Sequence, residues 1–143
     1  MNISLGGDHA GYEYKEEIIS MLSELGHSVI DHGPFSADSV DYPDFVKPVA
    51  TTVISGLSHF GIVICGSGNG VAMTANKYPE IRAALCWNLE LAKLAREHNN
   101  ANVLAIPARF IELDLAKEMV EIFLKTEFEG GRHQRRVEKI SCS

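Results

Sequence analysis

Cysteines are few in this sequence, and their spacing fits neither a disulfide framework nor a metal site. The 143 residues include three, Cys65, Cys86 and Cys142, with no CxxC pair and no Cys/His ligand pattern. An odd number argues against a secreted disulfide-bonded domain, so a reducing cytoplasmic location is expected. The chain also lacks a basic leader followed by an apolar stretch, and no window approaches about 18 uninterrupted apolar residues. Targeting to a membrane is therefore not expected.

Positive charge is also scarce. Thirteen Lys and Arg residues stand against nineteen Asp and Glu, which gives a net charge of −6. That sign is wrong for a protein that coats nucleic acid or anionic lipid, so any bound anion must be captured by a local cluster. With 45% apolar and 22% charged residues the composition is that of an ordinary globular protein, and the length predicts a single domain over residues 1–143.

Short apolar runs alternate with amphipathic stretches along the chain. The run Phe60–Cys65 is apolar without alternation, as in a central strand covered on both faces. Regular alternation of this kind predicts an α/β fold, a three-layer α/β/α sandwich around a Rossmann-like sheet of five parallel strands. The expected strands are 3–5, 28–30, 60–65, 82–86 and 102–106, and the expected helices are about 14–25, 43–56, 71–77, 88–97, 113–124 and a tail at about 131–141.

Polar side chains cluster after the predicted strands. In a doubly wound fold, ligands bind beyond the carboxyl ends of the strands, so Asp8, His9, Tyr42 and Cys65 are expected to meet in one pocket. Cys65 runs directly into the glycine loop 66–70, whose backbone N–H groups could cradle a developing oxyanion. The loop could equally be a tight strand-to-helix turn. It matches neither the P-loop nor the G-x-G-x-x-G nucleotide motif.

The position of Cys65 sets it apart from the other two cysteines. A lone cysteine at a strand end is more often a small buried hydrophobe. A thiol just before a helix N-terminus, however, is where the thiolate is stabilised, so Cys65 is a candidate base or nucleophile. Cys86 lacks a glycine loop and Cys142 lies in the tail. Both are read as structural or incidental.

Two polar pairs and one basic cluster allow more than one interpretation. Asp8 and His9 could contact a ligand, or Asp8 could only cap the helix that follows. The pair His98-Asn99 could be a site, or only a favourable helix end. Arg132 and Arg136 share a helix face at i, i+4 and suit a phosphate, although basic clusters are often solvated faces or intersubunit ion pairs. Arg109, just past the last predicted strand, is a further candidate phosphate ligand. The histidines at 27, 32 and 59 lie among turn residues without obvious partners, so we interpret His27, His32 and His59 as surface residues.

Several separated motifs together are more specific than any single loop. They are Gly-Asp-His-Ala-Gly at 7–11, Asp-Tyr-Pro-Asp at 41–44, Ile-Cys-Gly-Ser-Gly-Asn-Gly at 64–70, Ala-Asn-Lys at 75–77, His-Asn at 98–99 with Asn-Val-Leu at 102–104, and Gly-Gly-Arg-His at 130–133. In this order, over about residues 2–140, they resemble the ribose-5-phosphate isomerase B and galactose-6-phosphate isomerase family.

The resemblance implies a metal-free aldose-ketose isomerase of the pentose phosphate pathway that needs no cofactor. It implies a homodimer with active sites at the interface, to which the helical tail contributes, and a possible tetramer. Cys65 would move a proton between C2 and C1, His98 would assist ring opening, and Ser67, where Thr is common, could take the thiol proton. Some relatives use a Glu elsewhere as the base, so Cys65 indicates the Cys-dependent subtype. Substrate contacts would come from Asp8, His9, Tyr42, Gly66, Ser67, Gly68, Asn69, Gly70 and Asn99, and phosphate contacts from His9, Arg109, Arg132 and Arg136.

Three other functions remain open at this level. The same machinery could act on a hexose 6-phosphate, although the galactose branch resembles heteromers that divide the site, whereas this chain carries every residue itself. The fold could also serve as a non-catalytic phosphosugar-binding module. A Cys-dependent hydrolase would need a histidine beside the Cys65 thiol.

Overall fold

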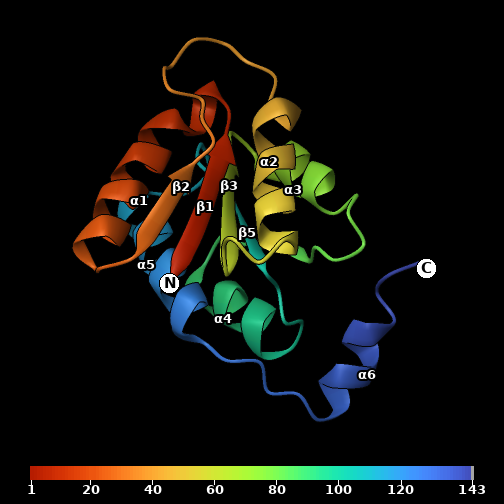
Figure 1. Ribbon diagram of the computed structural model, residues 1–143. Helices are drawn as coiled ribbons and strands as arrows, with labels where there is room; N and C mark the ends of the chain where they lie inside the picture. The colour runs from red at the N-terminus through yellow and green to blue at the C-terminus, as the bar shows by residue number, and fades with distance from the viewer. Residues whose placement is uncertain (143) are drawn as a thin grey trace.

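Five parallel strands form one sheet in the order β2-β1-β3-β5-β4 within residues 1–142, the part of the chain that the computed structural model describes (Figure 1). The predicted five-stranded parallel α/β fold is therefore confirmed. The strands are β1 (Asn2–Gly7), β2 (Ser28–Asp31), β3 (Phe60–Cys65), β4 (Ala83–Leu85) and β5 (Val103–Pro107). The helices are a short 3₁₀ turn η1 (His9–Gly11), α1 (Tyr12–Glu24), α2 (Pro43–Ile54), α3 (Asn69–Ala75), α4 (Leu89–Glu97), α5 (Leu113–Lys125) and α6 (Arg132–Glu138).

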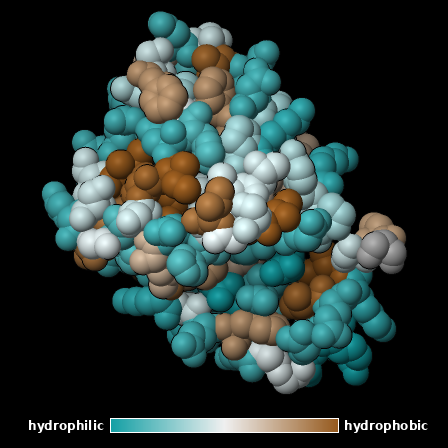
Figure 2. All heavy atoms as spheres, in the orientation of Figure 1, coloured by the Kyte–Doolittle hydropathy of each residue, from teal (hydrophilic) through white to brown (hydrophobic). Residues whose placement is uncertain are grey.

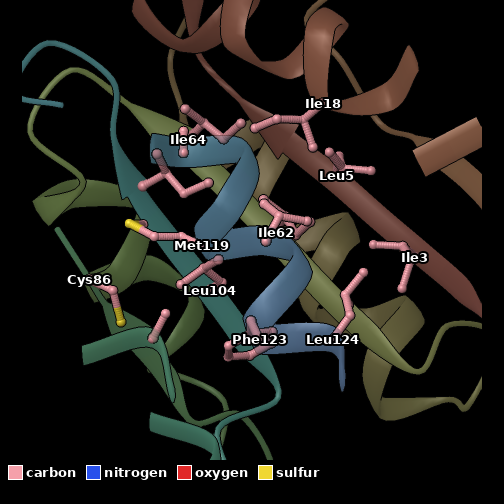
Figure 3. Packing of buried hydrophobic residues seen from close by; sticks show 14 of the residues in the cluster. Ile3, Leu5, Ile18, Ile62, Ile64, Cys86, Leu104, Met119, Phe123 and Leu124 are labelled. Atoms are coloured by element: carbon pink, nitrogen blue, oxygen red, sulfur yellow. The ribbon is translucent and has the colours of Figure 1, made fainter. Parts of the chain in front are cut away.

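Helices cover both faces of the sheet because the central strands are apolar on both sides. In β3, Ile62 and Ile64 pack on the face covered by α1, α4 and α5, whereas Val63 and Cys65 pack on the face covered by α2 and α3. Side chains alternate along a strand, so an uninterrupted apolar run supplies two cores at once. Figure 3 shows the larger core, in which residues of β1 and β3 face residues of α1 and α5.

The end of α4 is fastened to the connection that follows α5. Arg96 is 8% exposed, and its guanidinium lies 4.7 Å from the centre of the Phe60 ring. Its Nε donates to the carbonyl oxygen of Thr126 at 3.1 Å, and its Nη1 donates to the carbonyl oxygen of Ala101 at 2.6 Å. A buried arginine that is satisfied in this way holds three segments together, and it fixes the direction in which the chain leaves α5.

The strand order places the carboxyl ends of β1 and β3 at a switch point. From β1 the chain moves outward to β2, and it then returns to β3 on the other side of β1. Helical connections therefore leave β1 and β3 on opposite faces, which opens a crevice between their carboxyl ends.

The surface carries apolar side chains in separate patches. On the face shown in Figure 2, patches of apolar atoms are interrupted by hydrophilic side chains. Among residues 1–142, no helix combines the length and apolarity that crossing a bilayer requires.

Candidate active site

A pocket of about 450 Å³ lies at the carboxyl edge of the sheet. Residues that follow β1, β3 and β5 line it, together with the residue before α2. Its volume falls within the roughly 300–1,000 Å³ typical of small-molecule sites. The lining residues are Asp8, His9, Ala10, Tyr42, Cys65, Gly66, Ser67, Gly70, Arg109 and Phe110.

The glycine loop holds a backbone donor against the Cys65 thiol. The N–H of Gly68 donates to Cys65 Sγ at 3.2 Å, and Cys65 is 5% exposed. Gly68 adopts φ +76°, and a Cβ there would meet the Leu85 side chain at 2.4 Å. Position 68 therefore requires glycine for both its backbone conformation and its packing. The turn is built so that an N–H group faces the sulfur.

Arg109 is brought to the same loop by backbone pairing. The N–H of Ala108 donates to the carbonyl of Cys65 at 2.9 Å, and the N–H of Arg109 donates to the carbonyl of Gly66 at 3.0 Å. Atoms of the Arg109 side chain lie 3.1–3.5 Å from the place where a Cβ on Gly66 would be. The absence of a side chain on Gly66 lets the guanidinium lie along the loop, at the pocket.

Asp8 caps η1, and it also lines the pocket. Its Oδ1 accepts from the N–H groups of Ala10 at 2.9 Å and Gly11 at 3.2 Å, so the capping interpretation is correct. Both bonds fall on Oδ1, and the cap does not use the other carboxylate oxygen. His9 Nδ1 accepts from the N–H of Val40 at 3.3 Å. A neutral His9 ring then carries its proton on Nε2, where it can serve as a donor.

Tyr42 fills the side of the pocket next to the glycine loop. A Cβ on Gly70 would lie 2.4 Å from Tyr42 Cζ and 2.7 Å from its hydroxyl oxygen. The ring therefore rests directly on the backbone of the loop. Ala10 and Phe110 also line the pocket and were not singled out from sequence. For Phe110 the sequence held a signal, because it is an aromatic residue just past the end of a predicted strand; in the structure it is 75% exposed.

The other loop residues differ in where they lie. The exposed Ser67 hydroxyl lines the pocket and accepts from the N–H of Asn69 at 3.3 Å. Asn69 lines a neighbouring hollow with other residues of α3 and the residues just after it, and Gly68 is buried.

Six predicted site residues do not line this pocket in one chain, the loop residues Gly68 and Asn69 and four others. A helix that follows a parallel strand runs back across the sheet, so the end of α4 lies at the edge opposite to the glycine loop. His98 stands at that end, and α6 lies beyond the same edge in Figure 1. Asn99 lines a different groove, of about 680 Å³, with residues of β4 and the tail. Besides Gly68 and Asn69, the predicted site residues outside the pocket are His98, Asn99, Arg132 and Arg136.

His98 belongs to a second polar group, which it forms with Glu129 and His133. The His98 and His133 rings are stacked with centroids 4.2 Å apart, and Glu129 Oε1 lies 3.7 Å from His98 Nε2 and 3.6 Å from His133 Nε2. Burial and the nearby charges of His98 and Arg132 lower the pKa of His133. Sequence reasoning missed Glu129, whose role depends on how the connection after α5 folds back onto α4.

The remaining cysteines and histidines differ in their surroundings. Cys86 is 2% exposed, and burial raises the pKa of its thiol to about 12, whereas Cys142 is exposed. The expectation that three histidines lack partners was wrong. His27 Nδ1 lies 3.2 Å from the N-terminal nitrogen, His59 Nδ1 accepts from the N–H of Asn2 at 3.1 Å, and His32 Nε2 lies 3.4 Å from a threonine hydroxyl. Burial lowers the pKa of His32.

Comparisons with known proteins cover nearly the whole chain. Residues 3–140 match the ribose/galactose isomerase family. Ribose-5-phosphate isomerase B of Escherichia coli (strain K12) is 45% identical over 140 residues, which are 98% of this chain and 94% of that protein. The structure of a ribose 5-phosphate isomerase from Thermotoga maritima aligns with a TM-score of 0.96 at 48% identity, over 98% of this chain and 97% of the other.

A third relative was solved with a ligand. Ribose-5-phosphate isomerase B from Mycoplasma genitalium, with bound ribulose-5-phosphate, aligns with a TM-score of 0.94 at 45% identity. The alignment covers 97% of this chain and 93% of that one. On this evidence the chain belongs to the ribose/galactose isomerase family.

Proposed function

We propose that this chain interconverts D-ribose 5-phosphate and D-ribulose 5-phosphate through an enediolate. The observation that carries the proposal is the pocket in which a cysteine thiol, a loop of backbone donors and an arginine lie together. The activity named for its E. coli relative and the ribulose-5-phosphate bound to its M. genitalium relative support this choice of substrate.

Cys65 is the proposed base. Isomerisation removes the proton from C2 of the open-chain aldose and returns it to C1, while the second proton moves between the two oxygens. A positioned base and fixed donors for the enediolate oxygens are what such a step requires. The Gly68 N–H faces Sγ at 3.2 Å, and the Ser67 hydroxyl, which lines the same pocket, is assigned the role of helping to take the thiol proton. Metal or redox chemistry has no part in this sequence of steps.

The phosphate end is assigned to basic side chains. Arg109 reaches the pocket from β5, and His9 offers its Nε2 position. The guanidinium group of arginine can donate two parallel hydrogen bonds to phosphate oxygens. Binding energy from the phosphate, which does not react, then orients the carbons that do. Arg132 and Arg136, on one face of α6, would close the phosphate site from outside the chain that supplies Cys65.

The site is proposed to be shared between two copies in a homodimer. One chain carries the pocket with Cys65, and the opposite end of the same chain carries His98, which is assigned to ring opening. A second copy related by a two-fold axis would bring its His98 end to the pocket of the first, and the reverse. Exposed apolar side chains that such a partner could cover surround the carboxyl edge of the sheet, namely Met73 (66%), Trp87 (55%) and Phe110 (75%).

The test is conversion of ribose 5-phosphate by purified protein in the presence of a chelator, beside the Cys65→Ala variant and beside allose 6-phosphate. We expect pentose turnover that resists chelation and falls at least about a thousandfold in the variant, as when an essential base is removed. Turnover of allose 6-phosphate alone would show that the substrate is a hexose 6-phosphate and not the pentose. Tight binding of ribose 5-phosphate without conversion would leave a binding module and overturn the proposal.

A further inference from the structure

His98, Glu129 and His133 place three metal-ligating side chains within reach of one ion. One donor atom from each lies within 4.8 Å of the other two. Glu129 Oε1 is central to the group, 3.7 Å from His98 Nε2 and 3.6 Å from His133 Nε2. The three side chains are 39%, 51% and 11% exposed, so an ion can enter from solvent and still be partly enclosed.

These separations are close to those of a tetrahedral zinc site. Zinc binds imidazole nitrogen and carboxylate oxygen at about 2.0–2.2 Å, which puts neighbouring ligand atoms about 3.4 Å apart. Two of the three separations here need to shorten by only a few tenths of an ångström. The histidine rings are stacked at 13°, so their in-plane lone pairs point in nearly parallel planes, and at least one ring must rotate well out of the stack before both bind one ion. Gly130 and Gly131, with φ +70° and +54°, lie between Glu129 and His133, where the backbone can adjust.

The backbone holds the three residues in register before any ion arrives. The N–H of Glu129 donates to the carbonyl of Glu97 at 3.0 Å, which ties the connection to the end of α4 beside His98. The N–H of His133 donates to the carbonyl of Gly130 at 3.0 Å at the start of α6. Because the backbone is already held in place, binding requires rotation of the side chains but little ordering of the chain.

We propose that His98, Glu129 and His133 form an inhibitory site for Zn²⁺ or a similar transition-metal ion. The two imidazoles and the carboxylate each donate a lone pair, and the fourth position is filled by water or a substrate oxygen. A metal on His98 removes the lone pair that ring opening would use. This loss of activity rests on the proposed function of His98, whereas binding of the ion does not.

Charge and ligand type define which ions fit. Arg132 and Arg136 lie close enough to act on His133, so they oppose a cation and make the site weaker than a structural zinc centre. Two nitrogen ligands favour Zn²⁺, Co²⁺, Ni²⁺ and Cu²⁺. Mg²⁺ prefers oxygen ligands, and it is expected not to bind here.

The experiment titrates the full-length protein with Zn²⁺ in a calorimeter and with Co²⁺ by visible absorption, with Mg²⁺ as the negative control. The test variants are Glu129→Gln and His133→Gln. The matched controls are Glu127→Gln, an exposed carboxylate two residues away, and His59→Gln, an exposed histidine at the start of β3. Isomerase activity is measured with increasing Zn²⁺, and then again after a chelator is added.

We expect one Zn²⁺ per chain in the wild type and both controls, and at least about tenfold weaker binding in both test variants. Zinc inhibition should follow the same order and reverse with chelator. Saturable binding that is equal in all five proteins would place the ion elsewhere, and no saturable binding would remove the site; either result overturns the proposal. Binding as expected in a protein without isomerase activity would support the metal site and refute the proposed function separately.

Discussion

Replacement of Gly70 by alanine tests whether Tyr42 must rest on the glycine loop. The new Cβ would lie 2.4 Å from Tyr42 Cζ, and ordinary contact begins at 3.4 Å, so the ring must retreat by about 1 Å. A misplacement of about 1 Å in a site residue can cost about 100-fold in rate, and we expect a loss of that size in kcat/KM.

Stability should change little in the same variant. Gly70 lies in α3, where alanine is favoured over glycine by about 0.5–1 kcal/mol, and Tyr42 lines an open pocket into which it can move. The free energy of unfolding, measured by urea denaturation, should therefore stay within about 1 kcal/mol of the wild type. A large loss of activity with an unchanged unfolding curve would place the effect in the site and not in the fold.

A double-mutant cycle isolates the contact between the two residues. Gly70→Ala is introduced into the wild type and into Tyr42→Ala, and kcat/KM is measured for all four proteins. In the Tyr42→Ala background the clash is absent, so Gly70→Ala should cost less than about tenfold. Wild-type activity in Gly70→Ala, or an equal loss in both backgrounds, would refute the reasoning.

Two further predictions concern a cysteine and a buried lysine. Iodoacetamide at pH 8 should alkylate Cys142 and leave Cys86 unmodified in the native protein, because burial raises the pKa of the Cys86 thiol to about 12; mass spectrometry of tryptic peptides would show the contrary result as a labelled Cys86. Lys15 is buried, with Nζ 2.9 Å from both Asp31 and Glu16. Asp31→Ala should lower the free energy of unfolding by about 3 kcal/mol, because it removes the less exposed partner of a buried charge, whereas Glu16→Ala should cost under about 1 kcal/mol. Equal losses in denaturant unfolding would contradict this ranking.

Hydrophobic patterning was enough to predict the sheet. The run Phe60–Cys65 has the same bounds in the structure, because a strand buried on both faces leaves no polar position within it. The strand expected at 82–86 is shorter, at Ala83–Leu85. The backbone N–H of Arg82 donates instead to a side-chain oxygen, Asn102 Oδ1, at 2.8 Å.

The site was predictable only where it follows strand ends. Cys65 ends a parallel strand, and Asp8 and Arg109 closely follow two others, so topology alone brings them to one edge. His98 follows a helix, and the return of that helix across the sheet separates it from Cys65 in one chain. The contact between Tyr42 and Gly70, and the approach of Glu129 to His98, depend on how separate loops pack. The hydrophobic periodicity of the sequence does not predict such contacts between loops.

Subunit complementation tests most directly the central claim, that Cys65 of one copy works with His98 of another. Cys65→Ala and His98→Ala are each expected to be inactive as purified proteins. After they are unfolded together in equal amounts and refolded, half of the dimers combine one copy of each. Every such dimer holds one intact site and one doubly altered site, so about a quarter of wild-type activity should return. If dimers form, as checked by size-exclusion chromatography, but the mixture stays inactive, the shared site is contradicted.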